Sequence, residues 1–129
     1  MALTALELSP EELKKYHPLE FIRKRGSETR VEVAKRRRRA LTVARKAAKL
    51  LKEKFGAKEV ILFGSLARRG SFTLYSDIDL AARGIHSDYY LTAMETVLYM
   101  NAEFKIDLID PAFCSPAMRD EIKKDGKQL

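Results

Sequence analysis

A strand, a turn and a second strand are predicted from the stretch between Val60 and Leu80, which reads V-I-L-F-G-S-L-A-R-R-G-S-F-T-L-Y-S-D-I-D-L. Its first four residues are apolar, which indicates a buried strand, and Gly64 with Ser65 then predicts a turn. Eleven residues separate Ser65 from Asp77, and Asp79 follows Asp77 after one residue. Because side chains alternate along a strand, both carboxylates of a strand that begins at Asp77 would lie on one face. Such a pair suits Mg²⁺, which takes one or two carboxylates together with substrate phosphates.

The length and composition favour one intracellular domain. A chain of 129 residues can bury a core without disulfides, and the lone Cys114 cannot form an internal one and agrees with a reducing compartment. No run of about 18 apolar residues is present, so a transmembrane segment is not expected. The first residues also lack the basic start of a signal peptide. We therefore expect a cytoplasmic protein without a membrane partner.

The net charge of +7 is unevenly distributed. Residues 1–58 hold 17 Lys and Arg against 7 Asp and Glu, a balance of +10, whereas residues 59–129 hold 8 against 11, a balance of −3. Five consecutive cations run from Lys35 to Arg39 within a predicted helix, so they would surround most of its circumference and are expected to protrude from the core. One interpretation is a nucleic-acid or partner-docking surface. The other, which we favour, is a solvated helix segment, because no aromatic residues lie between the charges to stack on bases.

The pattern along the chain predicts an α+β fold, a small mixed β-sheet flanked by helices. Ser9 and Ser27 are candidate helix N-caps, and Gly56 is a candidate C-cap. We expect an N-terminal helical extension over residues 1–26 and a catalytic domain over residues 27–129. The predicted helices cover 9–16, 27–54, 66–69, 88–101 and 115–125, and the predicted strands cover 60–63, 77–83 and 104–109. In the helix over 88–101, the residues expected to face inward are Leu91, Met94, Val97 and Leu98.

A third carboxylate is predicted on the last of these strands. Asp107 lies between Ile106 and Leu108, so its side chain would emerge on the face opposite to theirs. An aspartate in an apolar strand is costly unless it is paired or bound to metal, and Lys105 is the alternative partner. Phosphoryl transfer with two metal ions needs carboxylates, donors for the phosphates and a group at the attacking oxygen. Gly64 and Ser65 can supply the donors, because glycine permits close approach of the backbone to phosphate oxygens.

Three segments together resemble the polymerase β-like nucleotidyltransferase superfamily, and most closely its minimal nucleotidyltransferase (MNT) branch. They are L-F-G-S-L-A-R at 62–68, S-D-I-D-L at 76–80 and I-D-L at 106–108, and the resemblance spans residues 60–109. It implies a fold like the polymerase β palm and two Mg²⁺ ions held by Asp77, Asp79 and Asp107. It also implies that Asp107 helps to deprotonate an acceptor hydroxyl, and that the nucleotide contacts are Gly64, Ser65, Arg68 and Ser76. The family form is Gly-Ser-x-Ala-Arg-Gly, and here Arg69 is inserted before Gly70, so either Arg68 or Arg69 could face the phosphates.

The same resemblance implies an activity and a partner. The activity is transfer of a nucleoside monophosphate, AMP from ATP, to a hydroxyl, and the partner is a HEPN-type ribonuclease toxin that an MNT antitoxin silences by modifying a tyrosine. The chain agrees in having no room for an acceptor domain and no Arg-x(4–6)-His motif of its own. Three alternatives stay open: an antitoxin that acts by contact alone, an enzyme that modifies a small molecule such as an aminoglycoside, and a nucleic-acid-binding protein that uses Lys35 to Arg39. A homo-oligomer is compatible with each.

Overall fold

The computed structural model describes the backbone of residues 18–129 and the side chains from Thr29 onward. The chain divides into two compact units, Met1–Ala34 and Lys35–Leu129, and the second contains every predicted site residue. The predicted helix over residues 9–16 lies outside the described residues. No described helix combines the length and the hydropathy that crossing a membrane requires. The division between an extension over 1–26 and a catalytic domain over 27–129 stays a prediction.

One long helix, α2, covers Pro18–Phe55. The predicted start at Ser27 was wrong, because the helix already runs through Gly26 from Pro18, and proline is common at the first position of a helix. Within the second unit, its inner face is made of alanines, Val43 and Leu51, all buried. The predicted C-cap is confirmed, since the helix ends at Phe55 and Gly56 has a φ of +71°.

The sheet has four strands in the order β3-β2-β1-β4. They are β1 (Glu59–Phe63), β2 (Ile78–Arg83), β3 (Ile106–Ile109) and β4 (Lys127–Gln128). β1 pairs with β2 and β4 in antiparallel fashion, whereas β2 pairs with β3 in parallel. The sheet is therefore mixed, as predicted, and the α+β class is confirmed. β4 was missed because two polar residues carry no strand pattern.

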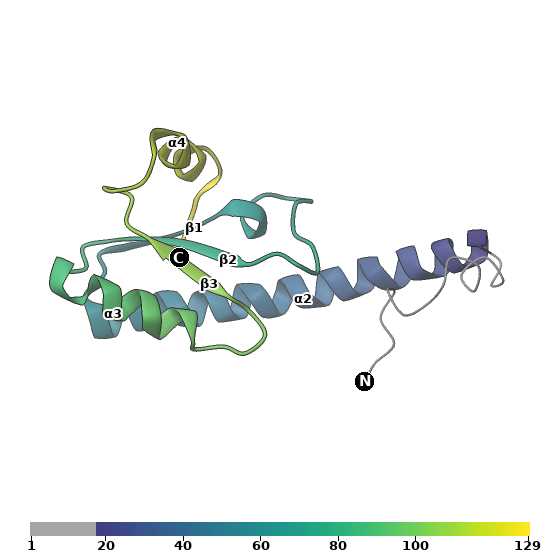
Figure 1. The fold of residues 1–129 in the computed structure, drawn as a ribbon, viewed down its shortest axis with the longest axis horizontal. Coiled ribbons are helices and arrows are strands. Elements are labelled where there is room, and N and C mark those ends of the chain that lie inside the picture. Colours follow the sequence, from purple (N-terminus) through teal and green to yellow (C-terminus); the bar gives the residue numbers. More distant parts are fainter. Residues whose placement is uncertain (1–17) are drawn as a thin grey trace. The chain divides into compact units, whose positions relative to one another are not determined.

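The two faces of the sheet have different covers (Figure 1). Ile122 of helix α4 (Pro116–Asp125) packs on one face against Phe63 and Ala81. Alternation places Asp79 and Asp107 on this same face. The opposite face carries Leu62 and Leu80, each at most 1% exposed, and lies toward α2 and helix α3 (Ser87–Leu98).

Helix α3 differs from its prediction in the face that it buries. Ala93 and Val97 are fully buried, whereas Leu91 is 67% exposed and Met94 is 39% exposed. The small Ala93 allows α3 to pack closely beside β3, and this rotation turns Leu91 and Met94 away from the core. Two large apolar side chains are thereby left at the surface beside β3.

The short connections also differ in detail. Instead of a helix over 66–69, a single 3-10 turn, η1, covers Gly64–Leu66, and the backbone N–H groups of Ala67 and Arg68 both donate to the Gly64 carbonyl at 3.1 and 3.2 Å. The predicted start of the last helix is confirmed, because the Ser115 hydroxyl accepts a hydrogen bond from the Met118 N–H at 3.2 Å.

Candidate functional site

Asp79 lies where three segments of the chain meet. In the sheet register it is opposite Phe63 of β1 and beside Asp107 of β3. Gly64 follows Phe63 directly, with a φ of +74°, and a Cβ added there would collide with the Asp79 carboxylate. The turn after β1 therefore needs glycine for its backbone conformation and for its close approach to Asp79. The predicted partners Gly64, Asp79 and Asp107 are brought together.

The electrostatic surroundings of Asp79 are unfavourable to its negative charge. Burial and the neighbouring charges of Asp107, Asp77 and Glu121 together raise its pKa from the ordinary 3.8 to about 6, while Arg68 acts in the opposite direction. Uncompensated carboxylates around one partly buried position attract a cation, because a positive charge relieves both their repulsion and the penalty of burial.

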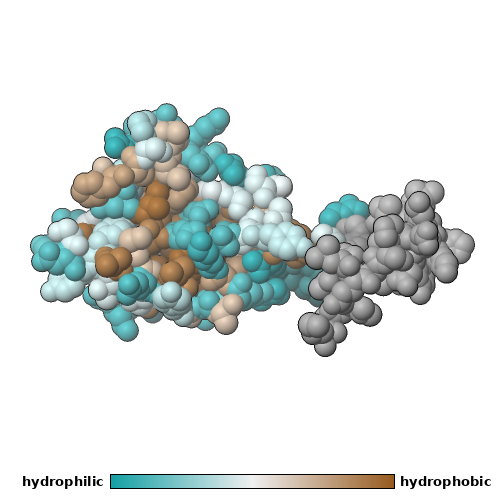
Figure 2. All heavy atoms as spheres, viewed as in Figure 1, coloured by the Kyte–Doolittle hydropathy of each residue, from teal (hydrophilic) through white to brown (hydrophobic). Residues whose placement is uncertain are grey.

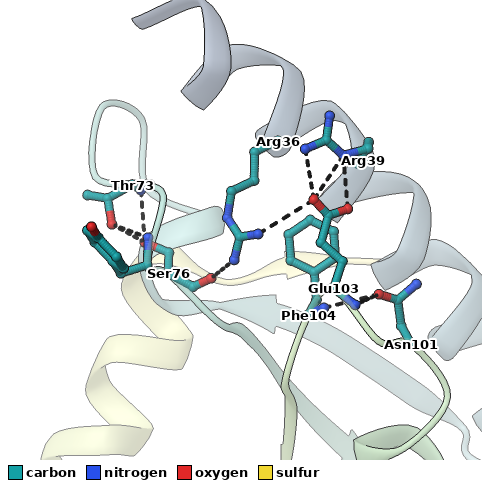
Figure 3. A network of polar contacts seen from close by, with 8 residues as sticks. Arg36, Arg39, Thr73, Ser76, Asn101, Glu103 and Phe104 are labelled. Atoms are coloured by element: carbon teal, nitrogen blue, oxygen red, sulfur yellow. Dashed lines mark hydrogen bonds and ion pairs between the residues drawn. The ribbon is translucent and has the colours of Figure 1, made fainter. Parts of the chain in front are cut away.

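Asp77 lies immediately before β2 and is partly exposed. One residue, Ile78, separates it from Asp79, so strand alternation favours the same face for both. Ser76 shapes the preceding loop, and its predicted contact with a nucleotide stays a prediction. Its Oγ accepts a hydrogen bond from the Thr73 N–H at 2.9 Å, and its carbonyl accepts one from Arg36 Nη2 at 3.0 Å (Figure 3).

The two arginines after the turn are both exposed, and Arg68 is already paired. Its Nη1 lies 3.0 Å from Oε1 of Glu121 on α4. Glu121 therefore acts on the site twice, by holding Arg68 and by raising the Asp79 pKa. Sequence reasoning missed it, because an acidic residue in a polar helix resembles any solvated position.

Asp107 also meets its alternative partner. Lys105 Nζ lies 3.6 Å from Asp107 Oδ1, with 59% of the lysine side chain and 41% of the aspartate side chain exposed. Exposed ion pairs contribute little to stability, about 0–1 kcal/mol. Asp107 can therefore leave Lys105 for another partner at little cost in stability.

The donor set fits Mg²⁺ in chemistry and in charge. Among residues 29–129, no three acidic, His or Cys side chains are placed so that they could hold a metal ion by themselves. Mg²⁺ does not require such a cage, since one or two carboxylates, water and phosphate oxygens satisfy it. Asp77, Asp79 and Asp107 offer only oxygen ligands, and burial raises the Asp79 pKa with a further contribution from the charges of Asp107 and Asp77. The three-carboxylate metal site stays a prediction.

A cavity of about 540 Å³ opens beside these carboxylates. Asp79, Asp107 and Glu121 contribute to its lining, and the rest of the wall is largely apolar and comes from α3, β3 and α4. A second cavity of about 590 Å³ shares Met94, Leu108 and Ile109 with the first, so the two are adjacent. Figure 2 shows hydrophobic surface gathered over this part of the molecule, between α3 and α4.

The sequence of this chain is similar to those of known proteins. Residues 45–129 match the family model described as polymerase beta, nucleotidyltransferase. A protein of Methanocaldococcus jannaschii named "Putative protein adenylyltransferase MJ0128" is 35% identical over 86 residues, an alignment that covers 64% of this chain and 87% of that protein.

Solved structures agree with the sequence matches. A mutant of the toxin-antitoxin MntA-HpeT superposes with a TM-score of 0.52 at 26% identity, covering 66% of this chain and 69% of the other. A toxin-antitoxin structure with AMP-PNP has a TM-score of 0.53 at 24% identity, covering 66% and 70%, and shows the shared fold. The predicted superfamily is confirmed: the chain belongs to the polymerase β nucleotidyltransferase family and is a nucleotidyltransferase.

Proposed function

We propose that this chain transfers AMP from ATP to a hydroxyl of a partner protein, with Mg²⁺, and that the partner is a toxin that the transfer silences. The observation that carries the proposal is the convergence of Asp79 of β2 and Asp107 of β3, on one sheet face, with Gly64 of the turn that follows β1. The named adenylyltransferase at 35% identity supports AMP as the transferred group, and the likeness to a toxin-antitoxin protein at 26% identity supports the kind of partner.

The nucleotide would bind over the turn after β1. The backbone at Gly64 has no side chain to block the approach of phosphate oxygens, and the half-exposed Ser65 adds a hydroxyl donor. Asp77 and Asp79 would hold Mg²⁺, which when bound neutralises the phosphates and the leaving pyrophosphate. Arg68 could join them only by leaving Glu121, which lies 3.0 Å away.

Asp107 would act on the acceptor. It is the carboxylate on the edge strand β3, with 41% of its side chain exposed to the cavity side of the sheet. In the proposed reaction the acceptor hydroxyl passes its proton to Asp107 as its oxygen bonds to the α-phosphorus of ATP. The bond from that phosphorus to the bridging oxygen breaks, and pyrophosphate leaves with the electron pair.

The cavity beside β3 gives the acceptor its route. Its apolar wall, with Leu91 and Met94 exposed on α3, suits a protein segment whose apolar side chains accompany the reacting hydroxyl. A small cationic antibiotic would instead need a dense set of polar contacts, and the walls from α3 and α4 supply mainly aliphatic surface. The lining therefore favours a protein acceptor.

The test is transfer of label from α-³²P-ATP to a candidate partner, taken first from the adjacent reading frame and purified in complex with this chain. Asp77→Asn with Asp79→Asn should abolish labelling, whereas Glu53→Gln with Asp120→Asn, the same charge change at exposed positions, should leave it intact. Labelling by the Asp77 and Asp79 double variant would refute the proposed site. If the Asp77 and Asp79 double variant transfers no label but still neutralises the toxin, the chain is an antitoxin that acts by contact.

A further inference from the structure

One arginine of the cationic run points inward. Arg36 extends from α2 across the edge of the sheet, and only 14% of its side chain is exposed. Its Nη2 donates to the Ser76 carbonyl at 3.0 Å, and its Nη1 lies 3.7 Å from Glu103 Oε2 (Figure 3). The prediction that Lys35 to Arg39 protrude as a group was wrong for this side chain.

Aromatic rings hold the guanidinium in this place. Its carbon lies 4.4 Å from the centre of the Phe104 ring and 5.9 Å from that of Phe72, and both rings are buried. A planar guanidinium can stack on a ring while its N–H groups donate sideways, which a lysine ammonium cannot do. The Nε of Arg36 is buried without a hydrogen-bond partner among the described residues, so this placement is not optimal for stability alone.

The two segments that Arg36 joins lead directly to the carboxylates. Ser76 precedes Asp77 in the chain, and Phe104 lies three residues before Asp107. The segments first meet where the Ile78 N–H donates to the Lys105 carbonyl at 3.0 Å, at the start of the β2 and β3 pairing. Arg36 therefore spans the entry of both strands from outside the site.

The ends of this bridge are themselves fixed. Arg39 binds both Glu103 oxygens, with three hydrogen bonds of 2.8 to 3.1 Å. The Asn101 side-chain oxygen accepts hydrogen bonds from the N–H groups of Glu103 and Phe104 at 2.8 and 3.0 Å. With both loops held locally, a shift of Arg36 would change their separation, and with it the separation of the strands that they start.

We propose that Arg36 is a positioning residue for catalysis, which sets the spacing of Asp77 and Asp79 against Asp107 through the Ser76 carbonyl and the Phe104 ring. The catalytic consequence rests on the proposed nucleotidyl transfer, whereas the structural link does not. Arg36 touches none of the three carboxylates, and it meets Ser76 only at the backbone carbonyl, so its effect on the carboxylates must pass through the two loops.

The test compares Arg36→Met and Arg36→Lys with Arg38→Met, which removes the same charge from an exposed neighbour. Methionine keeps an apolar stem over Phe104, and Glu103 keeps its hydrogen bonds to Arg39, so the change leaves no buried charge without a partner. Amide hydrogen exchange of the full chain without partner should become at least tenfold faster at Ile78 in Arg36→Met. The exchange rate at Leu62 in β1 and the thermal midpoint of unfolding should be the same in Arg36→Met as in Arg38→Met.

With the acceptor complex, Arg36→Met should lower kcat at least tenfold and change the KM for ATP less than threefold. The kcat of Arg36→Lys should lie between those of Arg36→Met and the unaltered chain. Equal exchange in Arg36→Met and Arg38→Met would overturn the structural link. Exchange accelerated evenly through the sheet, with kcat loss matching the unfolded fraction, would reduce Arg36 to a general stabiliser and overturn the positioning role. Should Arg36→Met fail to fold, Arg36→Lys carries the same comparisons.

If the unaltered chain labels no partner, the proposed function is refuted without bearing on Arg36. The exchange rate at Ile78 then decides whether Arg36 holds the start of the β2 and β3 pairing. Faster exchange at Ile78 in Arg36→Met than in Arg38→Met supports this structural role of Arg36, and equal exchange overturns it.

Discussion

Replacing Asp79 by asparagine should stabilise this protein when no metal is present. The Asp79 pKa is about 6 in the folded chain, above the ordinary 3.8, because burial and the charges of Asp107, Asp77 and Glu121 disfavour its ionised form. A carboxyl group whose pKa rises on folding binds its proton more tightly in the folded state. Its ionisation therefore destabilises the fold fully above pH 6, progressively less toward pH 3.8, and hardly at all below.

The size of this effect follows from the shift. About two pKa units at about 1.4 kcal/mol each give about 3 kcal/mol at pH 7.5. Asp79 is partly exposed, so solvent screening reduces this to roughly 1.5 kcal/mol. At pH 4.5 the same two pKa values leave about a third of the difference, roughly 0.5 kcal/mol.

The assay is urea unfolding of Asp79→Asn in EDTA at both pH values, with Asp120→Asn as the control for net charge. We expect Asp79→Asn to exceed the control by roughly 1.5 kcal/mol at pH 7.5 and by much less at pH 4.5. Equal stability of the two variants at pH 7.5 would refute the reasoning, as would a gain of the same size at both pH values.

Four further variants test the turn after β1, the cap of α4 and the ion pair beside Asp79. Gly70→Ala should lose about 1–2 kcal/mol in urea unfolding because its backbone has positive φ. Gly64→Ala should lose more, because its φ is also positive and its added Cβ collides with the Asp79 carboxylate, and it should also abolish nucleotidyl transfer. Equal activities of the two variants would contradict that contact. Ser115→Ala should lose about 1 kcal/mol as an N-cap, and unchanged unfolding would show that the cap contributes nothing. Glu121→Gln should tighten ATP binding in titration calorimetry by freeing the guanidinium that it pairs with; weaker binding would show that the ion pair itself is needed.

The parts of the fold that follow from local pattern could be predicted from the sequence. Val60 to Phe63 is a buried strand because it is apolar and bounded by turn residues, and Ser115 before Pro116 begins a helix through its own side chain. The juxtaposition of Asp79 and Asp107 was expected as well, because alternation puts each on the face opposite its apolar neighbours.

The parts that depend on tertiary contact could not be predicted. The apolar stripe of α3 did not reveal that Ala93, and not Leu91, would face β3, because periodicity gives a face but not its rotation against a neighbour. Arg36 is indistinguishable from Arg38 in the sequence, and only the position of the Ser76 carbonyl and the Phe104 ring separates them. Glu121 gave no signal, since its contribution depends on where α4 crosses the sheet.

The contacts of the basic side chains bear on how a triphosphate would be held. Arg68 is paired with Glu121, Lys105 is paired with Asp107, and Arg36 is committed to the loop before Asp77. None of these three cations is placed for phosphate, and the charges closest to Asp79 are mostly negative. An incoming triphosphate would therefore be repelled unless it arrived with a cation, and the uncharged donors after β1, which are backbone N–H groups and the Ser65 hydroxyl, carry no such conflict. An acidic site of this kind favours a nucleotide that binds as its metal complex, which is the form in which we expect this enzyme to use ATP.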